Sequence, residues 1–161
     1  MLLVAINSMP GIRYRELLRL TGLCNGVLAH HLSALEKSSR IRVDRQRENR
    51  TTRYYSTNIT SQESDILRQL KNKVSRQIIK FVISHNLCTF NELVEHLGKA
   101  SSTVSWYLKR LREAGIISVR YSEYQLYYIE NVELVSEVLD KYRESFIDTT
   151  VTNYSQMIEE L

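Results

Sequence analysis

The sequence contains little cysteine, proline or glycine. Its 161 residues include two cysteines, one proline and five glycines. Cys24 and Cys88 cannot form the disulfide framework of a small secreted domain, so we expect reduced thiols in an intracellular protein. So few prolines and glycines leave little room for long loops. The sequence therefore predicts a mainly helical fold.

Long apolar runs are absent as well. No stretch approaches the ~20 apolar residues that cross a bilayer. Residues 1–6 are apolar, but they are too short for the core of a signal peptide and no basic segment precedes them. The sequence therefore predicts a soluble, cytoplasmic protein.

The sequence carries no motif of a known catalytic or cofactor site. It has no phosphate-binding glycine loop, no nucleophile elbow and no HExxH. His30 and His31 are adjacent, and neighbouring side chains on a helix point about 100° apart, so they do not share one ion easily. We therefore expect no enzymatic activity, no cofactor and no metal site. Thiol redox sensing through Cys24 or Cys88 is an alternative use of the cysteines.

Charge is distributed unevenly along the chain. The formal net charge is +4. Residues 1–57 carry ten Lys/Arg against four Asp/Glu, residues 58–130 ten against seven, and residues 131–161 two against seven, which gives +6, +3 and −5. A basic body with an acidic end indicates an anionic partner for the body. A solvated surface with uneven charge is the alternative.

The stretch 101–119, SSTVSWYLKRLREAGIISV, predicts a helix followed by a strand. Val104, Leu108 and Leu111 recur at helical spacing. The small hydroxyl residues that open the stretch suit a helix start, where a side-chain oxygen caps backbone N–H groups. Gly115 predicts the helix end, and the β-branched residues after it favour a strand.

The same order of elements occurs earlier in the chain. Leu28 matches Val104 and Leu32 matches Leu108, a displacement of 76 in both cases (104 − 28 and 108 − 32). The first copy then holds three more residues before a Tyr-Tyr pair, which is what a tolerant hairpin tip allows. We interpret the two stretches as two copies of one small domain. Helices are predicted over 2–8, 14–20, 26–35, 61–70, 74–82, 90–97 and 101–114, and strands over 41–44, 53–56, 116–119 and around 121–129.

Three local features refine this prediction. Ser61 is expected to cap its helix, with a weak point near Asn72 before the next helical stripe. Thr89 and Glu92 form the sequence of a capping box. Residues 45–52 are polar throughout and predict a loop.

Residues 131–161 contain a second kind of pattern. Apolar residues recur there at spacings close to a heptad seam. We interpret the segment as helical, with a possible break over the poor helix formers 149–152. We expect it to pair two chains as a homodimer; packing on the chain's own second domain is the alternative. The stripe comprises Val135, Val138, Leu139, Tyr142, Phe146, Ile147, Val151, Tyr154, Ile158 and Leu161.

On these residues the chain resembles winged helix-turn-helix transcription regulators of the MarR and ArsR type. SSTVSWYLKRLREAGIISV resembles their recognition helix and following strand, and residues 26–35, GVLAHHLSAL, resemble the version with a histidine pair. The tandem arrangement with an arginine-rich first hairpin resembles archaeal regulators built from two winged helices. The resemblance covers about residues 2–130. It implies a mainly α fold with small β-hairpins: tandem winged helix-turn-helix domains at 1–58 and 59–130, followed by the C-terminal helical segment 131–161.

The resemblance also implies a function. A third helix with a polar outer face fits the major groove of double-stranded DNA. The chain would then be a DNA-binding transcription regulator associated with the nucleoid. The implied contacts are Asn25, Gly26, Ala29, His30 and Ser33 in the first copy, and Ser101, Ser102, Thr103, Ser105, Trp106, Lys109 and Arg110 in the second. For Trp106, packing against a neighbouring helix or a partner is the alternative.

The first hairpin is rich in arginine. Arginine donors suit phosphate oxygens and narrow minor grooves. The candidates are Arg42, Arg45, Arg47, Arg50 and Arg53, of which Arg45, Arg47 and Arg50 are expected at the tip. A solvated hairpin with internal ion pairs is the alternative. The second hairpin has no such excess of charge, and its four tyrosines suggest a packing surface.

A protein-interaction module is the rival interpretation. Winged helices also dock on the transcription machinery, including basal transcription factors, through tyrosine-rich surfaces. In that case DNA contact would run through the first domain alone or be absent.

Overall fold

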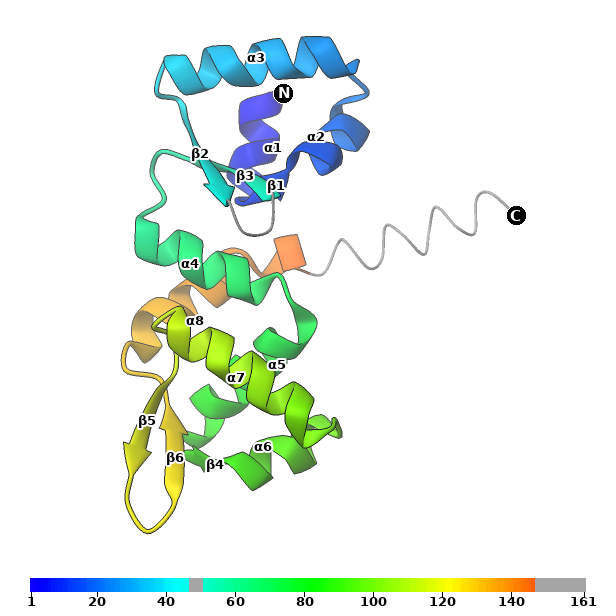
Figure 1. Cartoon of the computed structure of the whole chain (residues 1–161). Coiled ribbons are helices and arrows are strands. Elements are labelled where there is room, and N and C mark those ends of the chain that lie inside the picture. Colours follow the sequence, from blue (N-terminus) through cyan, green and yellow to red (C-terminus); the bar gives the residue numbers. More distant parts are fainter. Residues whose placement is uncertain (47–50, 147–161) are drawn as a thin grey trace, which may run out of the picture. The chain divides into compact units, whose positions relative to one another are not determined.

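The computed structural model describes residues 1–46 and 51–146 (Figure 1). It is mainly helical with two small antiparallel sheets, as the sequence predicts. The described residues divide into two compact units, one containing 1–64 with 142–146 and the other containing 65–141. Among these residues, none of the helices combines the length and apolar character that crossing a bilayer requires.

The first unit is built around three helices and one sheet. A single cluster of buried apolar side chains joins the helices to the sheet, with Ile6, Leu17 and Leu28 fully buried. The sheet has the strand order β1-β3-β2 and pairs Ile12 and Val43 with Tyr54. The elements are α1 (Leu2–Ser8), β1 (Ile12–Arg13), α2 (Tyr14–Thr21), α3 (Asn25–Lys37), β2 (Ile41–Gln46) and β3 (Thr51–Ser56).

Gly11 joins α1 to this sheet in a conformation that suits glycine alone. Its φ is +73°, and a Cβ atom there would lie 3.0 Å from the ring of Tyr55. Its backbone N–H donates to the carbonyl of Tyr54 at 2.8 Å. Its own carbonyl accepts a hydrogen bond of 2.9 Å from Nη1 of Arg53. The turn at Gly11 is thus fixed by both the backbone and a buried arginine.

The second unit has the same kinds of element. Leu93, Val104 and Leu111 are fully buried, so α6 and α7 pack through the apolar stripes that the sequence predicts. The sheet has the order β4-β6-β5. After α4 (Ser61–Leu70), whose residues fall on both sides of the division, come α5 (Lys73–His85), β4 (Cys88–Thr89), α6 (Phe90–Leu97), α7 (Ser101–Glu113), β5 (Ser118–Tyr121), β6 (Gln125–Tyr128) and α8 (Val132–Lys141).

The bounds of the first short strand and of the two helices after it repeat between the two units at a constant displacement. α2 and α6 begin at residues 14 and 90, and α3 and α7 begin at 25 and 101, so both pairs differ by 76. A hydrogen bond repeats with them. The backbone N–H of Arg13 donates to Glu16 Oε2 at 2.7 Å, and that of Thr89 donates to Glu92 Oε2 at 2.7 Å.

The residues that cap the helices agree with the sequence at Thr89 and differ from it at Ser61. Thr89 and Glu92 form the predicted capping box of α6. The residue before α4 is Thr60, and its hydroxyl accepts from the N–H of Glu63 at 3.1 Å, so Ser61 is not the cap. In the described structure the cap position of α7 is Ala100, and no side chain caps that helix.

Two boundaries differ from the prediction for simple reasons. Asn72 separates α4 from α5 completely, because its Oδ1 accepts from the N–H groups of Val74 and Ser75 and caps the second helix. β2 extends to Gln46 and β3 begins at Thr51, so part of the predicted 45–52 loop is paired strand. The two-residue strands β1 and β4 are too short to show a period in the sequence.

Four of the five described residues of the C-terminal stripe are buried, and the fifth, Leu139, is half-buried. Val135, Val138, Tyr142 and Phe146 are each at most 8% exposed. Contacts within the chain therefore cover these four side chains. Val135 and Val138 belong to the second unit, as the alternative to dimerisation predicts, whereas Tyr142 and Phe146 belong to the first. The remainder of it, and the predicted break at 149–152, lie outside the described residues.

Candidate nucleic-acid interface

Helices α6 and α7 form a helix-turn-helix with a short connection. α6 ends at Gly98 in the left-handed conformation, and α7 begins at Ser101. Val104, Leu108 and Leu111 are buried on one side of α7. That packing fixes which face of α7 points to solvent.

The solvent face of α7 is polar and cationic. Ser101, Ser102, Ser105 and Lys109 are exposed, and Thr103 is half-buried. The first turn, SSTV, contains no acidic residue. The positive end of the helix dipole and its unbonded N–H groups are therefore available to an anion such as a phosphate. The sequence-predicted residues of the second copy thus lie together on one helix face.

Trp106 lies in the middle of that face, with 51% of it exposed. Cζ of Arg110 lies 4.7 Å from the centroid of its ring. The Tyr107 ring stands edge-on to the indole, with centroids 4.8 Å apart at 87°. Because half of the indole is exposed, burial against a neighbouring helix does not account for it.

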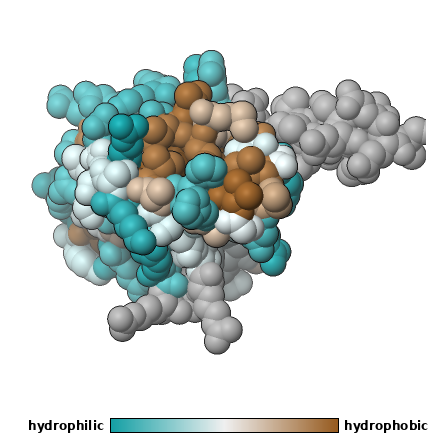
Figure 2. Space-filling model, turned by 90° about the horizontal axis from the view of Figure 1, so that it is seen from above, coloured by the Kyte–Doolittle hydropathy of each residue, from teal (hydrophilic) through white to brown (hydrophobic). Residues whose placement is uncertain are grey.

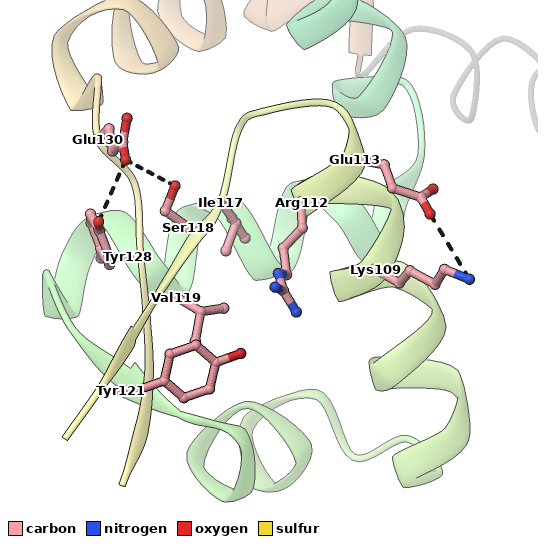
Figure 3. A pocket seen from close by; sticks show the side chains of 9 residues that line it. All are labelled: Lys109, Arg112, Glu113, Ile117, Ser118, Val119, Tyr121, Tyr128 and Glu130. Carbon is pink, nitrogen blue, oxygen red and sulfur yellow. Dashed lines mark hydrogen bonds and ion pairs between the residues drawn. The ribbon is translucent and has the colours of Figure 1, made fainter. Parts of the chain in front are cut away.

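A hollow lies between α7 and the hairpin β5–β6 (Figure 3). Arg112 extends into it from α7, opposite Val119 and Tyr121 (Figure 3). Nζ of Lys109 lies 3.9 Å from Glu113 Oε1. The hydroxyls of Ser118 and Tyr128 donate to Glu130 Oε1 at 3.1 and 3.5 Å. Two cations and two carboxylates line this hollow, so it is close to neutral.

The tyrosines of the second hairpin differ in their exposure to solvent. Tyr127 is buried, where burial raises its pKa above the usual value. Tyr121 and Tyr124 are 74% and 70% exposed. Tyr127 therefore packs as the sequence predicts, whereas Tyr121 and Tyr124, which lie near the turn, are exposed to solvent.

In the first unit, the outer face of α3 carries little charge. Gly26, Ala29, His30 and Ser33 are exposed on this helix. The charged residues of α3, Glu36 and Lys37, both fall in its last turn. The sequence-predicted residues of the first copy do share one helix, but that helix offers phosphate no cation near its start.

Asn25, the remaining candidate on α3, is held by Tyr14. The Tyr14 hydroxyl donates to both the side-chain oxygen and the backbone oxygen of Asn25. This contact links the start of α2 to the start of α3. Sequence reasoning did not identify it, because a tyrosine eleven residues away carries no local pattern.

The arginines of the first hairpin differ in burial and in their contacts. Arg53 is 7% exposed and bonded to Gly11, so burial removes it from any contact with phosphate. Arg42 is half-buried, with Cζ 5.3 Å from the ring centroid of Tyr55. Arg47 and Arg50 lie outside the described residues.

Arg45 is exposed but already paired. It lies on β2 rather than at the tip, opposite Thr52. Its two terminal nitrogens donate to the two carboxylate oxygens of Glu36, each at 2.7 Å. These hydrogen bonds hold the pKa of Glu36 below its usual value. Binding of phosphate by Arg45 would have to compete with this carboxylate.

The cysteines differ in exposure. Cys24 is exposed at the start of α3, and Cys88 is buried in β4. Burial raises the pKa of the Cys88 thiol to about 11, which disfavours the reactive thiolate. In the described parts of the chain, no three His, Cys, Asp or Glu side chains are grouped so that they could hold a metal ion.

Comparison with known proteins gives one match to a family. Residues 72–119 match the arsR family of bacterial regulatory proteins. The arsR-family segment starts at the cap of α5, includes all of α6 and α7, and ends in β5. A search of curated proteins finds no match to the chain.

Two solved structures resemble about half of the chain. HlyU from Vibrio cholerae N16961 is 21% identical, with a TM-score of 0.46, over 52% of this chain and 90% of that protein. The transcriptional repressor BigR from Xylella fastidiosa is 22% identical, with a TM-score of 0.44, over 50% of this chain and 82% of that protein.

Two cations of the arsR-family segment were missed in the sequence. Lys99 is exposed in the turn just before α7, and Arg112 is exposed in its last turn. Lys99 follows the glycine that ends α6, so its place in the turn before α7 can be read from the sequence. Arg112 gives no such signal, because its place beside the hairpin depends on tertiary packing.

Proposed function

We propose that this chain is a DNA-binding transcription regulator and that α7 enters the major groove of double-stranded DNA. One observation carries the proposal. Within the arsR-family segment, α7 buries Val104, Leu108 and Leu111 and exposes a face of serines and cations. A helix of this kind fits the major groove and can contact both base edges and phosphates.

The cations of α7 and its preceding turn divide between two roles. Lys99, Lys109 and Arg112 suit contacts with phosphate, which fix the position of the protein on the duplex. Ser102, Ser105, Trp106 and Arg110 would contact base edges. The exposed N–H groups at the start of α7 add a further contact with phosphate.

The first unit acts in this proposal as a second winged helix with a smaller part in binding. The constant displacement of 76 between element bounds supports an origin as two copies of one domain at 1–58 and 59–130. Its contribution to DNA binding would come from Arg45, Arg47 and Arg50 of the first hairpin. The uncharged outer face of α3 is a poorer match to DNA than that of α7.

The salt dependence of DNA binding tests the proposal. Binding of a labelled random duplex should be measured by fluorescence anisotropy, starting at about 50 mM salt, where nonspecific contacts are strong. Replacing Lys109 by alanine should reduce the slope of log K against log salt by about 0.9 and weaken all sequences alike. Replacing Lys80, an exposed lysine of α5, is the matched control and should change neither quantity.

Two outcomes would contradict this assignment. If the wild-type protein fails to bind any duplex at low salt, it is not a DNA-binding regulator. If it binds but Lys109→Ala keeps the full slope, the interface lies elsewhere. The variant with Arg45, Arg47 and Arg50 all replaced by alanine then shows whether the first hairpin supplies the contacts, since its slope should fall by about three.

One observation favours a second candidate function, that of a protein-interaction module. Figure 2, which looks at the molecule from above the view of Figure 1, shows apolar surface gathered on this face. Exposed large apolar residues of the first unit are Met1, Val4, Leu20 and Val27. A contiguous apolar patch of this kind marks a contact with another protein. Retained DNA binding by a Leu20→Ser, Val27→Ser variant would show that DNA binding does not depend on this face, as expected if the face contacts a separate partner such as the transcription machinery.

A further inference from the structure

We infer that Trp106 and Arg110 act as one composite reader of DNA sequence, selective for a guanine beside a thymine. This inference rests on the proposed function of α7. It concerns which bases are chosen, a question that the fold and the family match leave open.

The geometry of the two side chains already couples them without DNA. They stand at i and i+4 on α7, where side chains of a helix are neighbours. Cζ of Arg110 lies 4.7 Å from the centroid of the indole ring, so the guanidinium stacks on its face. An arginine held in this way loses less side-chain entropy when it binds, which strengthens each hydrogen bond that it forms.

A chain of contacts fixes the indole in turn. The ring of Tyr107 stands edge-on to Trp106 at 4.8 Å. The Tyr107 hydroxyl accepts a hydrogen bond of 3.3 Å from Nδ2 of Asn72. Asn72 is itself anchored, since its Oδ1 caps α5. The orientation of Trp106 is therefore set by the first helix of the arsR-family segment as well as by its own.

The chemistry of the two groups selects the bases. A guanidinium has donors only, and guanine alone presents two acceptors, O6 and N7, in the major groove. The indole presents an apolar edge and a single donor, Nε1–H. Thymine matches it with a C5-methyl group and the O4 acceptor, whereas cytosine presents an N4 donor.

The spacing of the two groups fits neighbouring base pairs. Bases on one strand are separated by about 3.4 Å along the helix axis. A separation of 4.7 Å between guanidinium and ring is slightly more than one such step. With Arg110 on guanine, Trp106 therefore faces the adjacent base pair.

Selection of bound duplexes from a random pool, followed by sequencing, tests the inference. The wild-type protein should enrich a guanine next to a thymine. Arg110→Ala should lower the preference for that guanine by about tenfold or more, as expected for loss of a paired arginine contact. Trp106→Ala should lose the thymine preference and also weaken the guanine preference, because the guanidinium loses its support.

Two variants make the readout specific. Trp106→Phe keeps an aromatic face beneath Arg110 but has no N–H, so it should keep the guanine preference and weaken the thymine preference. Lys109→Ala is the matched control on the same face, and it should weaken binding while leaving base preferences unchanged. Circular dichroism checks that each variant folds.

The outcomes separate this inference from the function on which it rests. If the wild-type protein binds no duplex, the proposed function fails, and the inference fails with it. If DNA binds but Trp106→Ala and Arg110→Ala keep the wild-type base preferences, only the reader is wrong. If Trp106→Ala loses thymine but keeps the full guanine preference, the two side chains act separately and the composite reader is overturned.

Discussion

At the scale of single residues, Arg53 and Arg110 show that the sequence reveals where charge occurs but not whether that charge is buried or exposed. The sequence marks both as basic residues near a predicted DNA-binding element. Arg53 is buried and bonded to Gly11, whereas Arg110 is half-buried and stacked on an exposed indole. The pairing of β3 with β1 determines that Arg53 is buried. The helical spacing of four residues determines that Arg110 lies beside Trp106. Helical phase is readable from the sequence, whereas the pairing of β3 with β1 required the structure.

Gly11 is the residue at which a small change should have a large effect. Gly11→Ala should destabilise the protein by about 1–3 kcal/mol, because alanine is strained at positive φ. Its Cβ would also lie 3.0 Å from the Tyr55 ring. Urea denaturation followed by circular dichroism measures the change.

Gly26→Ala is the matched control for this substitution. A Cβ atom at Gly26 meets nothing within 4 Å. Gly26 also lies in the first turn of α3, where alanine is the better helix former. The control should be neutral, or stabilising by up to about 1 kcal/mol. Equal stability of the two variants would mean that the turn at Gly11 is not as described.

At the scale of elements, helices were easier to predict than the ends that define them. The apolar spacings of residues 104–111 placed α7 correctly, and the capping box at Thr89 placed the start of α6. The sequence also favoured a hydroxyl cap at Ser61, which was wrong, and placed the hydroxyl residues from Ser101 in the first turn of α7, where they lie without capping it. A hydroxyl residue inside the first turn and one at the cap look alike in sequence, since only the backbone path distinguishes them.

The two hydroxyl positions therefore predict unequal effects on stability. Thr89→Ala should cost about 1 kcal/mol, because it removes the hydroxyl that accepts from Glu92 N–H at 3.3 Å. Ser101→Ala should change stability by less than about 0.5 kcal/mol, as for surface positions without such a contact. Thermal unfolding distinguishes them, and a loss at Ser101 as large as that at Thr89 would contradict the assignment of Ala100 as the cap.

The capping box also predicts a dependence on pH. Hydrogen bonds from the Thr89 backbone and hydroxyl hold the pKa of Glu92 below its usual 4.5. A lowered pKa in the folded state means that the stabilisation is complete above the unfolded pKa and is lost as the pH falls through the folded value. Glu92→Gln should therefore flatten the loss of stability below pH 4.5. An acid profile identical to that of the wild type would show that Glu92 is not bonded in this way.

At the scale of the whole molecule, the main proposed DNA contact lies on α7 of the second unit and not on the first hairpin. Arginine count alone favoured the first hairpin. In the structure, Arg45 of that hairpin is paired with Glu36 and Arg53 is buried, whereas α7 has an exposed polar face. Charge per segment is readable from the sequence, but the share of that charge left unpaired depends on contacts such as Glu36–Arg45, nine residues apart.

Dimerisation can be tested by shortening the chain. Since Val135, Val138, Tyr142 and Phe146 are buried, pairing of chains through 131–161 must depend on the apolar residues that follow. The full chain should be a dimer by light scattering, and a chain ending at Phe146 should be a monomer. A monomer in both cases would end the prediction of a dimer through 131–161.

The most direct test of the central claim uses the intrinsic fluorescence of Trp106. It is the single tryptophan among 161 residues, and it stands in the middle of the proposed interface. The protein should be titrated with duplex DNA while emission and the anisotropy of the labelled DNA are recorded together. We predict that the emission changes in parallel with binding and recovers when salt releases the DNA. Binding seen by anisotropy with unchanged Trp106 emission would contradict the account, because DNA would then contact another surface.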